Sequence, residues 1–280
     1  MVGFRCSKWI ILPKYNRLNL KREFYMKSSI FFQMLTMIPS LLIGSIVETN
    51  RFDDILIYID QTSPRKTIVV CDLDNTLIVP CEPLGSVAWA EYLQHKLQSK
   101  GVSKKDSEVV EHILWKTIQP HIEMQTVDPK TSEVINELKK RQIPVLGLTA
   151  RFPEDSWFTF AQLQSVDIDL SLQKDLPQVN LQLPLEPYAS YEKGVLFSTT
   201  VNKKSAVLIK FLELHKMNLE CVIFVDDKHH HVEDVENACK KLGIQCIGVR
   251  FSGADEYFKT FNSSKAELQW EIFPNKIKAQ

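Results

Sequence analysis

Acidic or hydroxyl-bearing residues follow three short apolar runs of this 280-residue chain. The run TIVVC leads into DLDNT, which begins at Asp72; IPVLGL leads into TAR, which begins at Thr149; and CVIFV leads into DDK, which begins at Asp226. One DxD pattern alone carries little weight, because short acidic runs are usually solvated turns. Three such groups, one after each run, predict that they meet at one edge of a sheet, where α/β proteins bind their ligands.

The two aspartates of DLDNT fit the chemistry of phosphoryl transfer. Where a strand gives way to a loop, Asp72 can face a substrate while Asp74 reaches its leaving group. An aspartate can attack phosphorus and form an aspartyl-phosphate. A second carboxyl group can protonate the leaving oxygen and then accept a proton from water. This pair therefore predicts a hydrolase that acts on phosphomonoesters.

Carboxylates gathered at one sheet edge repel one another unless a cation neutralises them. Oxygen ligands beside a phosphate favour Mg²⁺, which shares the oxygens of its substrate. A threonine hydroxyl and a lysine ammonium group are the usual complement, since they bind the phosphoryl oxygens as their charge shifts. We therefore expect Mg²⁺ as the cofactor and a small phosphorylated molecule as the partner.

The elements that must position these groups alternate between strands and helices. Short apolar runs typical of buried parallel strands occupy residues 67–71, 143–148, 221–225 and 245–249. Helical spacing of apolar residues occupies 52–59, 131–141, 155–165, 204–214 and 232–242. This alternation predicts an α/β protein in which helices cover both faces of a parallel sheet.

The order of DLDNT, LTAR, a lysine at a helix start and VDD resembles the four motifs of the haloacid dehalogenase superfamily, most of whose members are phosphatases. The resemblance covers about residues 66–250 and implies a Rossmann-like fold. It implies that Asp72 is the nucleophile and Asp74 the general acid and base. It also implies that Thr149 and Lys204 bind the substrate phosphate, and that Asp72, Asp226 and the backbone carbonyl of Asp74 bind Mg²⁺.

Other residues of the same motifs are candidates for supporting roles. Lys203 competes with its neighbour for the lysine position, and Asp227 stands beside the metal-binding aspartate. Thr76 and Arg151 are further candidate supports, although a structural ion pair is an equal explanation for the arginine.

Three histidines make the fourth motif unusual. Members of the superfamily often carry Asp or Asn a few residues after this aspartate pair, whereas residues 229–231 here are all histidine. His231 is a candidate replacement as a support or a water-mediated ligand. We expect the three histidines to lie in a solvated loop, because three successive side chains rarely converge on one ion.

A closer resemblance is to an uncharacterised bacterial family of proteins similar to haloacid dehalogenases, which often carry signal peptides. Its features are DLDNTLI, GSVAWAEYL, VDP, LTAR and VDDKHHHVEDV. This resemblance implies an architecture and a location but no reaction. The alternative to a phosphatase is therefore a non-catalytic protein that binds a phosphorylated ligand or a partner.

An insert separates the first two motifs. About sixty residues lie between Thr76 and the strand at 143, and they include helical patterns at 88–98 and 108–117. In the superfamily such an insert is a cap, here small, helical and placed at about residues 80–127. A second stretch, 171–190, is polar and contains three prolines, which predicts a long loop or hairpin.

The first fifty residues differ from the rest. Residues 30–46 are uncharged and mostly apolar and follow a basic stretch, as in a secretory signal peptide. We expect an extension at 1–46, with a signal peptide or membrane anchor at 26–46, ahead of a haloacid dehalogenase-like domain at 50–280. A cleaved signal would make the protein periplasmic or secreted. The alternatives are a membrane-anchored protein and a cytoplasmic one whose N-terminal helix packs on the domain.

The charge balance argues against nucleic acid as a partner. Lys and Arg together number 34, as do Asp and Glu, but residues 1–49 carry seven basic and two acidic side chains. The remaining chain, with 27 basic and 32 acidic side chains, lacks the positive field that drives nucleic-acid binding. We expect membrane contact only through the N-terminal apolar segment. Six irregularly spaced cysteines form no recognisable disulfide framework.

Overall fold

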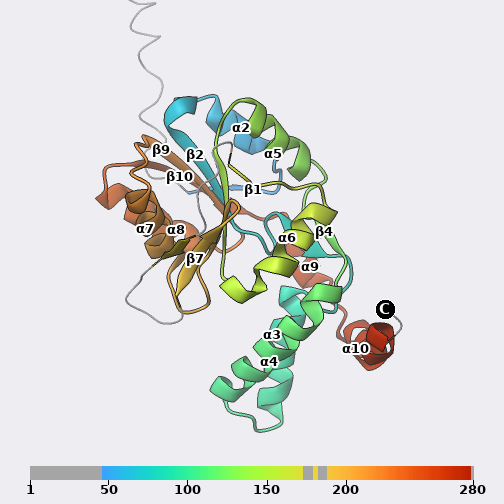
Figure 1. The fold of residues 1–280 in the computed structure, drawn as a ribbon. Helices are drawn as coiled ribbons and strands as arrows, with labels where there is room; N and C mark the ends of the chain where they lie inside the picture. The colour runs from blue at the N-terminus through green and yellow to red at the C-terminus, as the bar shows by residue number, and fades with distance from the viewer. Residues whose placement is uncertain (1–45, 173–178, 182–187, 279–280) are drawn as a thin grey trace, which may run out of the picture. The chain divides into compact units, whose positions relative to one another are not determined.

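The computed structural model describes residues 46–172, 179–181 and 188–278. Its main element is an eight-stranded sheet in the order β1-β10-β9-β2-β5-β8-β7-β6 (Figure 1). The strands from β1 to β8 in this order are parallel, and β7 and β6 continue the sheet in antiparallel pairing. Their bounds are β1 Val47–Thr49, β2 Thr67–Cys71, β5 Val145–Thr149, β6 Val179–Leu181, β7 Ala189–Glu192, β8 Val195–Phe197, β9 Cys221–Asp226 and β10 Gln245–Phe251. The predicted α/β class and parallel sheet are confirmed.

Side chains of the central strands alternate between two apolar cores. In β2, Val69 and Cys71 face one core, and Ile68 and Val70 face the other. The first core is covered by α2 (Asp54–Ile59), α5 (Thr131–Lys140) and α6 (Ser156–Ser165). The second is covered by α7 (Lys204–Leu214) and α8 (His229–Lys241), on the opposite face in Figure 1. Helices therefore cover both faces, as the sequence predicts.

The register of the strands brings their carboxyl ends to one level. Cys71 at the end of β2 pairs with Val225 of β9 and with Gly147 of β5. The next residue after Cys71 is Asp72, and the next after Val225 is Asp226, so both leave the sheet side by side. The predicted meeting of the motifs at one sheet edge follows from this pairing.

The insert between the first two motifs is a helical hairpin on a short stem. Strands β3 (Ile78–Pro80) and β4 (Met124–Thr126) pair antiparallel, and α3 (Val87–Ser99) and α4 (Lys104–Ile118) lie between them. Figure 1 shows these two helices projecting away from the sheet. Helix α4 begins four residues before its predicted start, because the Ser103 side chain caps it by accepting a hydrogen bond from the Asp106 amide.

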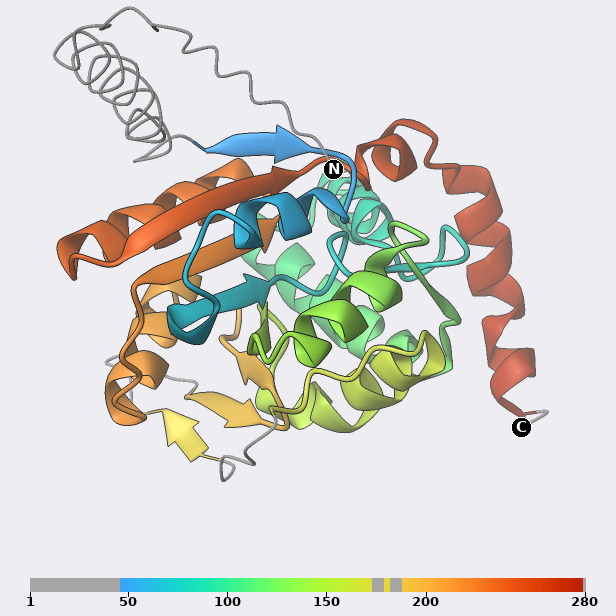
Figure 2. The same cartoon turned by 90° about the horizontal axis from the view of Figure 1, so that it is seen from above.

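A C-terminal helix that the sequence analysis did not predict packs on the insert. Helix α10 (Ser263–Lys278) places Trp270 6.3 Å from Trp89 of α3, measured between ring centroids. Glu267 of α10 accepts hydrogen bonds from Tyr92 and Lys96 of α3. Figure 2 shows α10 away from the edge of the sheet where β1 lies beside β10.

Other differences from the predicted elements are smaller. Strand β1 and helix α9 (Asp255–Lys259) were not predicted. The stretch 171–190, expected as a loop or hairpin, includes β6 and the start of β7, which pair antiparallel as expected of a hairpin. The histidines at 229–231 form the first turn of α8 rather than a loop, because the helix begins three residues earlier than predicted.

The structure corrects the prediction that the N-terminal apolar segment contacts a membrane. Within residues 46–172, 179–181 and 188–278, no helix combines the length and apolarity needed to cross a membrane. Residues 26–45 of the predicted signal or anchor lie outside this described part of the chain.

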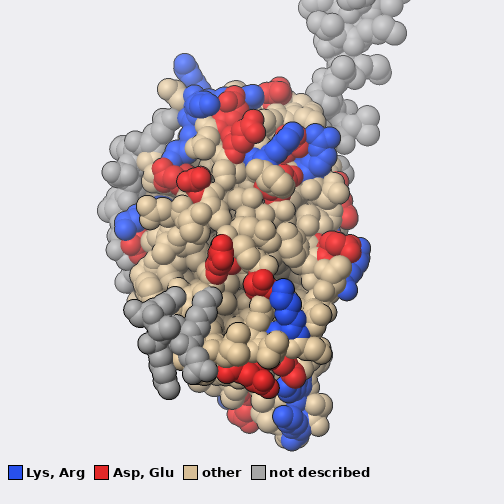
Figure 3. Space-filling model, turned by 90° about the vertical axis from the view of Figure 1, so that its right-hand side faces the viewer, with Lys and Arg blue, Asp and Glu red and all other residues tan. Residues whose placement is uncertain are grey.

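Charged side chains of both signs share the surface. On the face shown in Figure 3, Lys and Arg lie near Asp and Glu, with no broad area of one sign among the described residues. Several of the charges pair across elements, such as Lys265 with Glu82 at 2.5 Å and Arg250 with Asp255 at 2.7 Å.

Candidate functional site

A buried lysine joins two of the predicted aspartates at the carboxyl end of the sheet. The Lys204 Nζ atom lies 2.7 Å from Asp72 Oδ1 and 2.7 Å from Asp226 Oδ2. Lys204 begins α7, while the two aspartates follow β2 and end β9. Its neighbour Lys203 has an exposed side chain and pairs with Asp234 at 3.3 Å. The structure thus places Lys204, and not Lys203, between the two aspartates.

The Asp226 carboxylate is held from several directions. Besides Lys204, its Oδ1 atom accepts a hydrogen bond from the Lys228 amide at 2.8 Å. The Nδ1 atom of His231 lies 3.1 and 3.2 Å from its two oxygens. His231 reaches this position because the first turn of α8 points it back toward the end of β9. The structure therefore brings His231 to the site as a support of Asp226.

Three carboxylates form a candidate metal centre. One oxygen each of Asp72, Asp226 and Asp227 can be chosen so that all three lie within 4.8 Å of one another. Oxygen ligands alone, with hydrophobic strands behind them, match what Mg²⁺ requires of a protein site. The residues of this cluster fit the predicted Mg²⁺. Asp227 adds a carboxylate to the ligands that the sequence predicts.

The three carboxyl groups of the cluster differ in the direction of their pKa shifts. Burial raises the pKa of Asp72 to about 6, although the Lys204 charge opposes the shift. Burial, reinforced by the charges of Asp72 and Asp226, raises the pKa of Asp227 to about 7. Burial acts on Asp226 in the same direction, but Lys204 and His231 outweigh it and hold the pKa of that carboxyl below its usual range. A further positive charge beside Asp72 and Asp227 would favour their ionised forms.

The Asp74 side chain takes a different partner. Arg151 donates two hydrogen bonds to it, from Nε to Oδ2 at 2.9 Å and from Nη2 to Oδ1 at 2.7 Å. This two-point geometry is the strong form of an arginine–carboxylate pair. The Asp74 carboxylate is thus outside the three-aspartate cluster, and its backbone carbonyl is the group available for the predicted metal contact. The ion pair that the sequence offered as one role of Arg151 is present.

The remaining predicted residues are buried near these groups. Thr149 is 1% exposed, and its Oγ1 atom accepts a hydrogen bond from the Arg151 amide at 3.2 Å. Thr76 is fully buried, and within the described part of the chain its hydroxyl has no hydrogen-bond partner. The same holds for the Asn75 side-chain nitrogen, whose residue has a φ of 63° in the tight turn after Asp74.

A polar cleft of about 210 Å³ opens beside the cluster. Its loop, residues 198–203, holds Thr199 at a φ of 65°, which is a strained conformation for a β-branched residue. Asn202 donates a hydrogen bond to the Thr199 hydroxyl at 3.1 Å. Two residues that contact the cluster, Lys204 and His231, line the cleft, while the three aspartates do not. The lining also includes Ser198, Thr199, Asn202 and His230.

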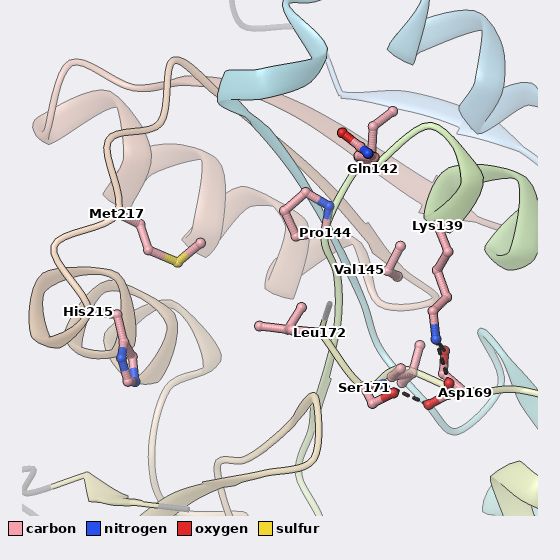
Figure 4. Close-up of a pocket in the computed structure, with 11 residues that line it drawn as sticks. Lys139, Gln142, Pro144, Val145, Asp169, Ser171, Leu172, His215 and Met217 are labelled. Carbon is pink, nitrogen blue, oxygen red and sulfur yellow. Dashed lines mark hydrogen bonds and ion pairs between the residues drawn. The ribbon is translucent and has the colours of Figure 1, made fainter. Parts of the chain in front are cut away.

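A second cavity, of about 300 Å³, is larger and more apolar but lies elsewhere. It is lined by Pro144 and Val145 at the beginning of β5, with Leu172, His215 and Met217 opposite (Figure 4). None of the predicted site residues lines it. Since parallel sheets bind ligands at the carboxyl ends of their strands, the polar cleft is the better candidate site.

Several residues near Asp74 were missed by the sequence analysis. Thr159 and Gln162 of α6 accept hydrogen bonds from Arg151, and Gln119 contacts Gln162. No spacing rule pointed to them, because 43 residues separate the two glutamines and the chain must fold before they meet.

Known proteins resemble this chain over most of its length. A protein of Chlamydia pneumoniae named "Putative outer membrane protein//CPj1034/CpB1074" is 26% identical over 205 residues, which are 72% of this chain and 75% of that protein. A protein of Chlamydia muridarum named "Putative outer membrane protein" is 22% identical over 75% of this chain and 77% of its own length. A protein of Chlamydia trachomatis with the same name is 23% identical over 72% of this chain and 75% of its own length.

A family model also matches, over residues 48–280, which include every residue of the candidate site. Its description is "Protein of unknown function (DUF2608)". The match covers more than half of the chain. The chain therefore belongs to the DUF2608 family of proteins of unknown function.

Proposed function

We propose that this protein is a Mg²⁺-dependent phosphomonoester hydrolase of the haloacid dehalogenase type. The observation that carries the proposal is the convergence of Asp72, Asp226 and Asp227 at the carboxyl end of the sheet, where the buried Lys204 ammonium group pairs with the first two. A cluster of three carboxylates and one lysine is suited to an anion that arrives with a divalent cation. The order of the motifs in the sequence supports the same reaction.

The residues that would hold Mg²⁺ are Asp72, Asp226 and Asp227, with the Asp74 backbone carbonyl. When bound, the ion supplies positive charge that lets a phosphate dianion approach carboxylates. Lys204 contributes a second positive charge to the same space, and Thr149 would donate its hydroxyl hydrogen to a phosphoryl oxygen.

In the first half of the proposed reaction, a carboxylate oxygen of Asp72 attacks phosphorus. The bond between phosphorus and the ester oxygen breaks, and Asp74 gives its proton to that oxygen, so that an alcohol leaves. In the second half, water attacks the phosphorus of the aspartyl-phosphate while the Asp74 carboxylate accepts its proton. Inorganic phosphate leaves and the Asp72 carboxylate is regenerated.

Phosphate release from a panel of small phosphoesters tests the proposal. The purified chain is assayed with Mg²⁺ and with EDTA, and Asp72→Asn serves as the matched variant. We expect metal-dependent release from at least one ester and none from the variant. Binding of Mg²⁺ without turnover of any ester would instead favour the alternative, a non-catalytic protein that binds a phosphorylated ligand or a partner.

We also infer that the protein acts in the bacterial envelope or outside the cell. The inference is supported by the names of the chlamydial relatives and by the apolar run at 30–46. Fractionation of cells that express the full chain, with sequencing of the mature N-terminus, tests it. Recovery of the intact chain in the cytoplasm would contradict it.

A further inference from the structure

A continuous chain of hydrogen bonds runs from Asp74 into the helical insert. It begins at Arg151, which is 4% exposed and binds Asp74 at two points. The Nη1 atom of Arg151 donates to Gln162 Oε1 at 2.6 Å and to Thr159 Oγ1 at 3.0 Å. All three of these partners come from the part of the protein that contains the sheet.

The next links reach the insert itself. Gln162 Nε2 donates to the backbone oxygen of Gln119 at 2.9 Å and to its side-chain oxygen at 3.0 Å. Gln119 Nε2 in turn donates to the Gly85 backbone oxygen at 2.7 Å. Gln162 and Gln119 are 5% and 1% exposed, so water competes little for these bonds.

The last two residues of this hydrogen-bond chain, Gly85 and Gln119, lie at the two ends of the helical hairpin. Gly85, with a φ of 82°, stands just before Ser86, the residue that caps α3. Gln119 directly follows α4. One glutamine side chain therefore joins the entry and the exit of the insert, where any rotation of the hairpin would act.

Helix α4 of the insert contacts the same arginine directly. The Arg151 guanidinium carbon lies 5.3 Å from the centroid of the Trp115 ring in α4. Phe158 of α6 lies 5.7 Å from the same carbon, and its ring centroid is 6.2 Å from that of Trp115. The plane of the guanidinium group thus depends on side chains from both parts of the protein.

We propose that Arg151, Gln162 and Gln119 are positioning residues that couple the seating of the helical insert to the orientation of the Asp74 carboxyl group. Gln162 uses both ends of its amide, one for the arginine and one for the insert. Displacing the hairpin would leave buried amide groups without hydrogen-bond partners, which costs free energy. We therefore expect the hydrogen bonds of this chain to form or to break together. The catalytic consequence rests on the proposed function, because it takes Asp74 to be the general acid and base.

The first experiment separates the two ends of Gln162. In Gln162→Glu the side chain still accepts from Arg151 but cannot donate to Gln119. Gln119→Met removes the side-chain bonds of Gln119 to Gln162 and to Gly85 and keeps only its backbone contact with Gln162. We expect both variants to lower kcat for an alkyl phosphate about tenfold or more, because a misplaced acid protonates poorly. The loss with p-nitrophenyl phosphate should be much smaller, since that leaving group needs little protonation.

Thr159→Val is the matched control, because it removes an Arg151 acceptor but leaves the links to the insert intact. We expect its ratio of alkyl to aryl turnover to stay near that of the unaltered protein. Equal losses on both substrates in the two glutamine variants would overturn the proposal. Glutamine variants that lose activity on neither substrate would overturn it as well.

The second experiment needs no turnover and so separates this inference from the proposed function. Coupling between two sites is reciprocal, so a substitution at Asp74 must change the stability of the contacts that seat the insert. In Asp74→Asn we expect amide hydrogen exchange in peptides spanning 81–90 and 117–123 to become about fivefold faster or more. Asp227→Asn changes a carboxyl group of the three-aspartate cluster, which is not part of the hydrogen-bond chain. It should leave the exchange rates of both peptides unchanged.

Unchanged exchange in Asp74→Asn would overturn the coupling even in an active phosphatase. Faster exchange in a protein that hydrolyses no ester would support the coupling and remove the proposed function alone.

Discussion

The two aspartates of DLDNT lie two residues apart but belong to different regions of the molecule. Asp72 is surrounded by groups from strand ends and from the first turn of α7, all carried by the sheet and its helices. Asp74 is held by Arg151, whose other contacts reach the two ends of the helical insert. The position of Asp72 thus depends on the register of the strands and on the start of α7. That of Asp74 depends also on how the insert is seated.

The comparison implies that the two groups can be lost separately. Asp72→Asn should reduce hydrolysis of every phosphoester to the uncatalysed background, because the nucleophile is removed. Asp74→Asn should lower kcat for alkyl phosphates by about 10²–10⁴-fold and affect p-nitrophenyl phosphate much less. Steady-state assays with both substrates measure this. An equal loss on both substrates in Asp74→Asn would show that the two aspartates act together after all.

The Asp72 region should also be sensitive in stability. Lys204→Met would leave buried carboxylates without their ammonium partner, and removing one member of a buried ion pair costs about 3–5 kcal/mol. We expect a large fall in the melting temperature, part of which Mg²⁺ restores by compensating the carboxylates. Lys203→Met is the matched control and should melt like the unaltered chain, because its side chain is exposed. A similar effect of both substitutions would mean that the buried cluster is not what Lys204 stabilises.

Binding of Mg²⁺ should stabilise the fold through the carboxylates of the Asp72 region and not through the side-chain contacts of Asp74. At a free concentration one hundred times the Kd, a ligand of the folded state adds about 2.7 kcal/mol to the free energy of unfolding. Thermal melting with increasing Mg²⁺ should therefore show a rising transition, and Asp227→Asn should weaken it. The Gln119→Met variant of the Asp74 region should respond to Mg²⁺ like the unaltered protein. A lost response in that variant would join the two regions into one.

The smallest effect is expected at the outer contact of the insert. Glu267 of α10 accepts hydrogen bonds from Tyr92 and Lys96, but this group lies at the surface, where ion pairs contribute little. Glu267→Gln should melt with the unaltered protein and keep its alkyl to aryl ratio. A change in the ratio would show that α10, and not only the Arg151 chain, controls the seating of the insert.

The core of the fold was predictable because its signals are local. Strand β2 and helix α7 coincide with the predicted residues, since continuous apolar runs and helical spacing report burial directly. The meeting of Asp72 and Asp226 was also predictable, because parallel strands place their carboxyl ends at one edge. By contrast, β1 is three residues long and α10 contains Pro274, which argues locally against a helix, so neither element was predicted.

The histidines show how a one-turn difference changes a role. Counted as a loop, residues 229–231 had no defined direction. As the first turn of α8, they place His231 against Asp226, while the side chain of His229 lies near Glu233 on the exposed surface. The start of the helix could not be read from the sequence, because no side chain caps it.

The sequence by itself determined which residues can do chemistry and at which edge of the sheet they gather, because motif order and strand pattern are properties of the chain. Only the tertiary structure decided how they are partnered: Lys204 between two aspartates, and Asp74 bound to Arg151 rather than to the carboxylate cluster. These partners are 22 positions apart for Lys204 and Asp226, 77 for Arg151 and Asp74, and 132 for Lys204 and Asp72. Distances in space of this kind follow from packing, which no local pattern encodes.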